Sequence, residues 1–161
     1  MITKRIFASC AVAIAAATTV PRAHAFDTCE IGARMPDGMI CAGLSPETGM
    51  PLYAFPADAP LIMKWREAMD YAASFESPGQ RMGSLRVPTA RELGVLYENR
   101  NEGALSGTFN ETGSDPSWYW SATEDIWSAN TGDAWSWRFD DGLVRGWSHK
   151  WLKLSVRLVR N

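Results

Sequence analysis

The first clear pattern in this chain is a segment, residues 64–77, whose apolar residues recur with the period of an α-helix. The apolar positions of this stripe are Trp65, Ala68, Met69, Ala72 and Phe75. Charged residues occupy the positions between them. This spacing predicts an amphipathic helix that buries one stripe and exposes the opposite face.

A second helix is expected to begin at Thr89. Thr89 and Glu92 have the spacing of a capping box, with Thr89 as the N-cap residue and Glu92 three positions later. Leu93 and Leu96 then share one side of the helix and are expected to face inward. The helix is expected to end near residues 99–101, shortly before a glycine.

Short strands are predicted on both sides of these helices, where apolar and polar residues alternate or turn formers bound an apolar run. The strand candidates are residues 39–44, 52–55, 118–123, 134–140, 143–147 and 151–160. Asp141-Gly142 is a hairpin turn signal, and residues 103–117 are expected to form a long loop. Helices and strands are segregated along the chain, which predicts an α+β fold that ends in an antiparallel sheet.

Seven of the eight tryptophans lie after residue 117. Trp118 and Trp120 share one strand face, as do Trp135 and Trp137, and core packing is the simpler interpretation for these four. Other aromatic residues lie near loops or strand ends, where an indole could stack on the apolar face of a sugar ring. The candidates for such a ligand face are Tyr119, Trp127, Trp147 and Trp151, with Arg145 as a contact for a ligand carboxylate or sulfate.

Acidic residues in the same region allow a calcium hypothesis, because calcium takes several carboxylate and carbonyl oxygens from loops. The candidates are Glu124, Asp125, Asp133, Asp140 and Asp141. The pair Asp140-Asp141 before Gly142 is also explained by a hairpin turn alone. No other cofactor is indicated.

The N-terminal residues 1–25 have the pattern of a cleaved signal peptide. Lys4 and Arg5 precede an apolar run, and Ala23-His24-Ala25 forms an A-x-A cleavage site. The run is too short to span a bilayer comfortably, which disfavours a retained anchor. The mature chain would begin at Phe26 and hold 161 − 25 = 136 residues, and the protein would be periplasmic or secreted.

The charge and cysteine content narrow the classes of partner. Residues 26–161 carry 13 basic and 18 acidic residues, a net charge of 13 − 18 = −5 without a basic run, which argues against nucleic-acid binding.

Cys29 and Cys41 flank a Pro36-Asp37-Gly38 turn signal. In an exported protein this pair predicts one disulfide. The alternative, a metal site, lacks further His or Cys ligands nearby.

Four segments in order, RVPTARELGVLYENR, FNETGSDPSWYWSATE, AWSWRFDDG and LSVRLVR, are similar to motifs of one bacterial family. From about Met39 to Arg160 the chain resembles the Lcl C-terminal domain family, named for the C-terminal domain of a collagen-like adhesin. The resemblance implies a C-type-lectin-like fold, with two helices packed on a twisted antiparallel sheet and long loops as the ligand surface. It divides the chain into an N-terminal segment, residues 26–38, and a domain, residues 39–161.

The chain departs from the family pattern in informative places. Leu85 replaces a common Trp, and Leu158 stands where the closing motif usually has Cys. The formylglycine-generating relatives need a reactive cysteine pair late in the domain, and this chain has no Cys after Cys41. It also lacks a collagen-like Gly-x-y repeat, so stalk-dependent trimerisation does not carry over.

These observations favour an exported, non-enzymatic module that binds a glycan or a surface polymer of the envelope or host. His149 is the one histidine after residue 25, and no Ser or Cys elbow accompanies it. The main alternative is a protein–protein module that docks on an envelope or host protein. A hydrolase that uses loop carboxylates, such as Asp125 and Asp141, is a third hypothesis. No membrane span is expected after cleavage.

Overall fold

The computed structural model describes residues 29–79, 83–126 and 132–161. The predicted signal peptide, residues 1–25, and Trp127 lie outside the described residues. The described strands are β1 (Ile40–Leu44), β2 (Pro51–Asp58), β3 (Trp118–Glu124), β4 (Asp133–Arg138), β5 (Val144–His149) and β6 (Arg157–Arg160). The helices are α1 (Trp65–Ser74), α2 (Ala90–Glu98) and the short 3₁₀ helices η1 (Gly103–Leu105) and η2 (Asp115–Ser117).

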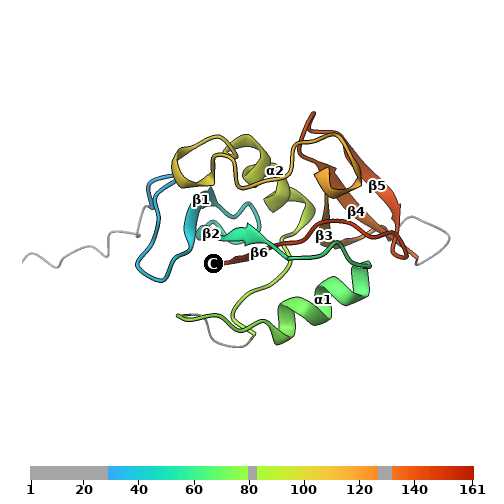
Figure 1. The fold of residues 1–161 in the computed structure, drawn as a ribbon, viewed down its shortest axis with the longest axis horizontal. Coiled ribbons are helices and arrows are strands. Elements are labelled where there is room, and N and C mark those ends of the chain that lie inside the picture. Colours follow the sequence, from blue (N-terminus) through green and yellow to red (C-terminus); the bar gives the residue numbers. More distant parts are fainter. Residues whose placement is uncertain (1–28, 80–82, 127–131) are drawn as a thin grey trace, which may run out of the picture.

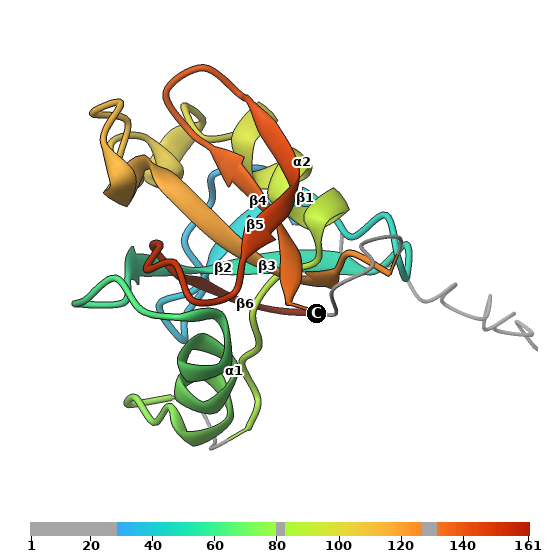
Figure 2. The ribbon, with the colours of Figure 1, turned by 90° about the vertical axis from the view of Figure 1, so that its right-hand side faces the viewer.

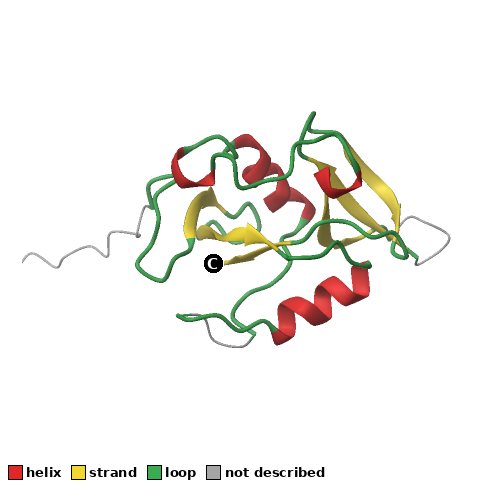
Figure 3. Ribbon diagram, viewed as in Figure 1, coloured by secondary structure: helices red, strands yellow, loops and turns green. Residues whose placement is uncertain are grey.

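The strands form two antiparallel sheets of three strands each, in the orders β1-β2-β6 and β3-β4-β5. The predicted α+β class is confirmed, but the expectation that the late strands form one sheet is wrong. The last strand, β6, instead pairs with β2 from before the helices, with Ala54 opposite Val159. The two helices lie on opposite sides of the strands (Figures 1 and 2), and long loops connect the elements (Figure 3).

Helix α1 buries the stripe that the sequence predicts. Trp65, Ala68 and Ala72 are buried, and Met69 is half-buried beside them. The Trp65 indole N–H donates to the Ser121 carbonyl at 2.8 Å and thereby ties α1 to β3. The helix ends at Ser74 and is therefore shorter than the predicted segment, residues 64–77.

Helix α2 begins with the predicted capping box. The Glu92 backbone N–H donates to Thr89 Oγ1 at 3.2 Å, and the Thr89 N–H donates to the Glu92 carboxylate at 2.9 Å. These bonds satisfy backbone donors that the first turn leaves without partners. Leu93 and Leu96 are fully buried, as predicted, and Asn99 caps the C-terminal end.

Strand β3 is buried on both faces along most of its length. Trp118 and Trp120 pack in one hydrophobic cluster, while Tyr119 packs with Phe139 in a second cluster on the other face. Ser121, also on the second face, is fully buried. Because β3 contacts both helices, neither of its faces is left to solvent.

The C-terminal segment also differs from the prediction, which made residues 151–160 one alternating strand. Only Arg157–Arg160 forms β6. Before it, Leu154 bridges to Met63 and Ser155 bridges to Tyr119, so this segment threads between the two sheets. The side chains on both sides of this segment are therefore buried from residue 154 to residue 159.

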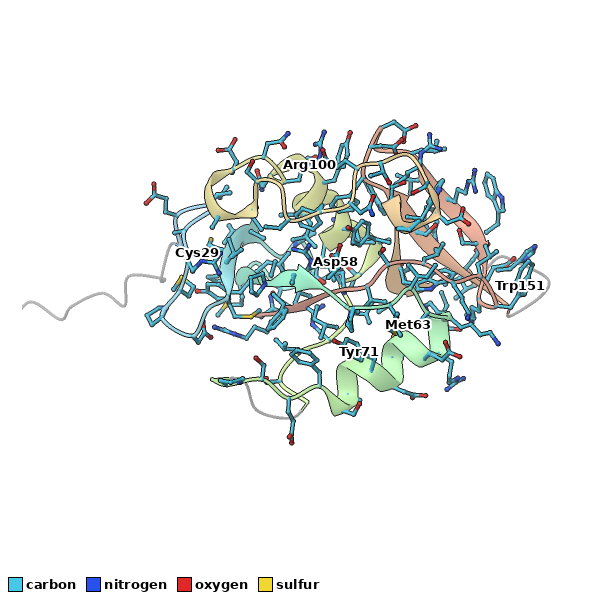
Figure 4. All side chains as sticks on the ribbon, in the orientation of Figure 1. Cys29, Asp58, Met63, Tyr71, Arg100 and Trp151 are labelled. Atoms are coloured by element: carbon cyan, nitrogen blue, oxygen red, sulfur yellow. A yellow bond between two sulfur atoms is a disulfide. The ribbon has the colours of Figure 1, made fainter. Side chains whose placement is uncertain are left out.

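A fully buried arginine, Arg157, links the two sheets. Its Nε donates to Asp58 Oδ1 at 2.8 Å, and its other nitrogens donate to Thr108 Oγ1, at 3.1 Å, and to the Thr108 carbonyl. The Tyr119 hydroxyl donates to the second Asp58 oxygen at 2.6 Å, in the middle of the molecule (Figure 4). The guanidinium also lies over the Phe109 ring, 4.0 Å from its centroid. Its charge is thus paired and hydrogen-bonded, as burial of a charge requires.

The predicted disulfide is confirmed: Cys29 and Cys41 are bonded. The Gly38 N–H donates to the Met35 carbonyl at 2.9 Å, which closes the turn expected between the two cysteines. In the chain-entropy model, a loop of this size stabilises the fold by about 3 kcal/mol. The bond fixes the N-terminal segment to β1.

A second buried charge, Glu92, joins α2 to the loop after β1. Its carboxylate accepts two hydrogen bonds from Arg86, at 2.6 and 2.7 Å, and one from the Ser45 hydroxyl at 2.5 Å. Burial alone would raise the pKa of Glu92. The hydrogen bonds from Arg86, Ser45 and the Thr89 backbone outweigh burial and lower this pKa below its ordinary value of 4.5.

This lowered pKa makes the contribution of Glu92 to stability depend on pH. The contribution is fully present above pH 4.5 and is lost as the pH falls through the lower pKa of the folded state. We expect Glu92→Gln to lower the free energy of unfolding by about 2 kcal/mol at pH 7, and by less in acid. Urea unfolding measured from pH 7 down to pH 3 checks this, with the exposed Glu98→Gln as control. A loss that stays constant with pH would contradict the assignment.

Candidate binding surface

Strand β5 carries the exposed aromatic side chains that distinguish this surface. It lies at the edge of its sheet, with β4 as its one neighbour in the described chain. Arg145, Trp147 and His149 are exposed at alternate positions, while Ser148 between the last two is buried. Trp147 and His149 point to one face because alternate side chains of a strand share a face. The shift in pairing between Ala134 and Ser136 places Arg145 on the other face, over the Trp118 ring.

Two tryptophans on this edge are unusually open to solvent. Trp147 and Trp151 are each 66% exposed. The His149 imidazole stacks on the Trp151 ring, with centroids 5.6 Å apart and planes inclined by 19°. We call Trp147, His149 and Trp151 the aromatic ridge. Figure 4 places Trp151 at one end of the molecule, pointing away from the core.

The turn that carries Trp151 is anchored on several sides. His149 Nδ1 lies 2.6 Å from Oδ1 of Asp133, a buried residue of β4. The Leu152 N–H donates to the His149 carbonyl at 2.8 Å, and the Trp65 N–H at the start of α1 donates to the Lys150 carbonyl at 3.1 Å. The ridge therefore combines exposed rings with a fixed backbone, a combination that limits the entropy lost on binding.

The prediction that Tyr119 contacts a ligand is wrong, because its side chain is fully buried. Burial, together with the charge of Asp58, raises the pKa of the Tyr119 phenol far above its ordinary value. Arg145 is exposed, and its guanidinium lies over the buried Trp118 ring, 4.2 Å from the centroid. Trp127 lies outside the described residues. Of the five residues predicted to contact a ligand, Trp147 and Trp151 thus lie together on the aromatic ridge.

The calcium candidates do not gather into one site. Glu124 pairs with Lys150 at 2.7 Å, and Asp133 contacts His149. Asp140 and Asp141 both pair with Arg138, and hydrogen bonds from Arg138 and the Leu143 N–H lower the pKa of Asp141 to about 2. Within the described ranges, no group of three or more His, Cys, Asp or Glu side chains is placed to hold a metal ion.

Sequence reasoning missed His149 as part of this surface. His149 stands in the sequence prediction only as a catalytic candidate, although its alternation with Trp147 indicates a shared strand face. Of the four tryptophans interpreted as core residues, Trp118 and Trp120 are buried, which confirms that prediction. Trp135 and Trp137 are only half-buried.

The chain belongs to the Lcl C-terminal domain family, whose domain matches residues 40–160. This match confirms the resemblance drawn from the four sequence motifs. No curated protein matches the chain. In the part of the chain that the structure describes, no helix is long and apolar enough to cross a membrane.

Proposed function

We propose that this protein is an exported, non-enzymatic binding module of C-type-lectin-like fold that recognises a glycan of an envelope or host surface polymer. The observation that supports this proposal is the aromatic ridge, with Trp147 and Trp151 each 66% exposed on an anchored strand and turn. Contiguous apolar patches on a protein surface mark interaction or ligand-binding sites. An indole ring offers an apolar face to a sugar ring and an N–H donor to its hydroxyls.

The surroundings of His149 support binding over catalysis. The neighbouring Ser148 is only 4% exposed, and its hydroxyl lies 2.6 Å from that of Ser136. A nucleophile must be within reach of both its base and the substrate, and Ser148 faces away from the ridge. His149 instead stacks on Trp151, where it supports the aromatic surface.

Export is part of the same proposal. The signal-like residues 1–25 and the bond between Cys29 and Cys41 both fit an oxidising compartment. The protein would act in the periplasm or outside the cell, where glycans and surface polymers are accessible.

Removal of a ridge tryptophan is expected to weaken glycan binding without unfolding the protein. We expect Trp147→Ala and Trp151→Ala each to raise the dissociation constant at least about tenfold, because interface tryptophans carry large shares of binding energy. The free energy of unfolding should change by less than about 0.5 kcal/mol for Trp147→Ala, since that side chain is mostly exposed. Calorimetric titration of glycans selected on an array, with urea unfolding in parallel, checks both values.

Leu61→Ala is the matched control, because Leu61 is 73% exposed and is not part of the ridge. It should leave the dissociation constant unchanged. Equal losses of binding in Leu61→Ala and the ridge variants would contradict a site at the ridge. Binding to an envelope or host protein that free sugars do not inhibit would replace the glycan with a protein partner.

A further inference from the structure

A hollow of about 450 Å³ opens beside the aromatic ridge, between the N-terminal end of α2 and the ends of β3 and β4. This volume falls in the range of sites that hold small ligands or single sugar rings. Its lining includes Glu47, Ala90, Arg91, Thr123, Ile126 and Trp135. Most of the lining surface is apolar.

Trp135 forms an aromatic wall of this hollow. Its indole packs against Gly146 of β5, where an added Cβ would lie only 3.1 Å from the ring. A side chain at residue 146 would press on the indole, which would have to shift by a few tenths of an ångström. The Trp135 ring packs against Gly146 of the sheet, which fixes its position. Trp135 is half-buried, and part of its side chain lines the hollow.

The polar groups around the hollow suit hydroxyls better than anions. The side chains of Arg91 and Glu47 are 70% and 37% exposed, and they lie 3.8 Å apart. Glu124 and Asp125 also border the hollow, so carboxylates outnumber guanidinium groups in its lining. A ligand carboxylate or sulfate would meet this negative charge, whereas sugar hydroxyls can donate to carboxylates and accept from Arg91.

The hollow and the ridge lie on one face of the sheet. The pairing of β4 with β5 shifts between Ala134 and Ser136, so that Trp135 lies opposite both Gly146 and Trp147. Two residues opposite one are the mark of a β-bulge. Since the adjacent Ser148 is buried on the other face, Trp147 points to the face of Trp135. Trp135 of the hollow and Trp147 of the ridge are therefore neighbours on one face of the sheet.

We infer that the Trp135 hollow is a second sugar subsite and that the ligand is a neutral oligosaccharide of several linked rings. One ring occupies the hollow against Trp135, with its hydroxyls at Arg91 and Glu47, and the following rings run across Trp147 to Trp151. This inference rests on the proposed function and adds the length and the charge class of the ligand.

Affinity for neutral oligosaccharides of increasing length tests the inference. Calorimetric titration uses cello- and chito-oligosaccharides from the mono- to the hexasaccharide, with oligogalacturonates as the anionic comparison. We expect affinity for at least one neutral series to rise with length, and oligogalacturonates to bind at least about tenfold more weakly than the neutral chain of equal length. Absence of binding to both neutral series, or tighter binding of oligogalacturonates, would overturn the inference.

Variants of the hollow give the second measurement. Arg91→Ala should weaken the longest bound oligosaccharide by about tenfold and leave the shortest bound one unchanged, because only the long ligand reaches both subsites. Trp135→Phe should act in the same direction, and Arg66→Ala, an exposed arginine of α1, is the matched control. The side chain of Arg91 is 70% exposed, so its removal should not unfold the protein.

The outcomes separate this inference from the proposed function. If long oligosaccharides bind Arg91→Ala and Trp135→Phe as well as wild type, the hollow is not a subsite, and the ridge remains the site. If anionic oligosaccharides bind and Trp151→Ala abolishes their binding, the glycan function stands and the neutral ligand is wrong. If Trp147→Ala and Trp151→Ala bind every glycan as wild type does, the proposed function itself fails.

Discussion

Arg157→Met is expected to lower the free energy of unfolding by about 3–5 kcal/mol, since removal of one partner from a buried ion pair leaves the other without compensation. Arg157 is fully buried and bonds Asp58 and both oxygens of Thr108. Methionine fills similar space but donates no hydrogen bond. The Asp58 charge would then lose its cationic partner and keep only the Tyr119 hydroxyl, and the Thr108 carbonyl would lose its hydrogen bond from Arg157. Because Asp58 of β2 also accepts a hydrogen bond from Tyr119 of β3, the loss should be felt in both sheets.

Arg160→Met on the same strand is the control. Arg160 pairs with Asp37 at 2.7 Å, but both side chains are partly exposed, at 26% and 27%. Partly exposed pairs contribute little, so this variant should lose no more than about 1 kcal/mol. Urea unfolding of the two variants under equal conditions measures the difference. Similar small losses in both would show that the guanidinium of Arg157 is not essential to the connection between the sheets.

Trp120→Ala is expected to cost a comparable amount, about 3–5 kcal/mol of unfolding free energy. The Trp120 side chain has no exposed surface, and its indole N–H donates to the Met63 carbonyl at 2.9 Å. Truncation would leave a large cavity and remove one of the two hydrogen bonds that the Met63 carbonyl accepts, the other being from the Leu154 N–H. The measurement is urea unfolding with circular dichroism. The natural comparison is Trp147→Ala, for which a change within about 0.5 kcal/mol is expected.

The contrast between Trp120 and Trp147 tests whether some tryptophans form the core while others form a ligand surface. If Trp147→Ala destabilised the fold as much as Trp120→Ala, Trp147 would be a core residue and could not form a ligand surface. A small loss in Trp120→Ala would instead mean that the cluster around β3 collapses readily into the vacated space.

Local features of this fold follow closely from the sequence. The start of α2 at Thr89 and Glu92 is predicted because a capping box uses hydrogen bonds between near neighbours in the chain. The buried stripe of α1 and the disulfide near the Pro36-Asp37-Gly38 turn depend on equally local spacing. The exposed positions of Trp147 and Trp151 were also predicted, since both lie near strand ends.

Features that depend on distant partners were missed. Alternation in β3 separates Trp120 from Tyr119, but it cannot tell that segments on both sides cover the strand. Tyr119 was therefore assigned to the ligand face, although its hydroxyl bonds Asp58, 61 residues earlier. The pairing of β6 with β2 is equally non-local, and so is the contact that brings Asp133 to His149. The β-bulge opposite Trp135 is another feature that alternation alone does not reveal.

A glycan array probed in parallel with wild type and with the double variant Trp147→Ala/Trp151→Ala is the most direct measurement of ridge-dependent glycan recognition. We expect wild type to bind a subset of glycans, and the double variant, with an unchanged circular dichroism spectrum, to lose those signals. Absence of any glycan signal for wild type, or full signals from a folded double variant, would contradict glycan recognition at the aromatic ridge.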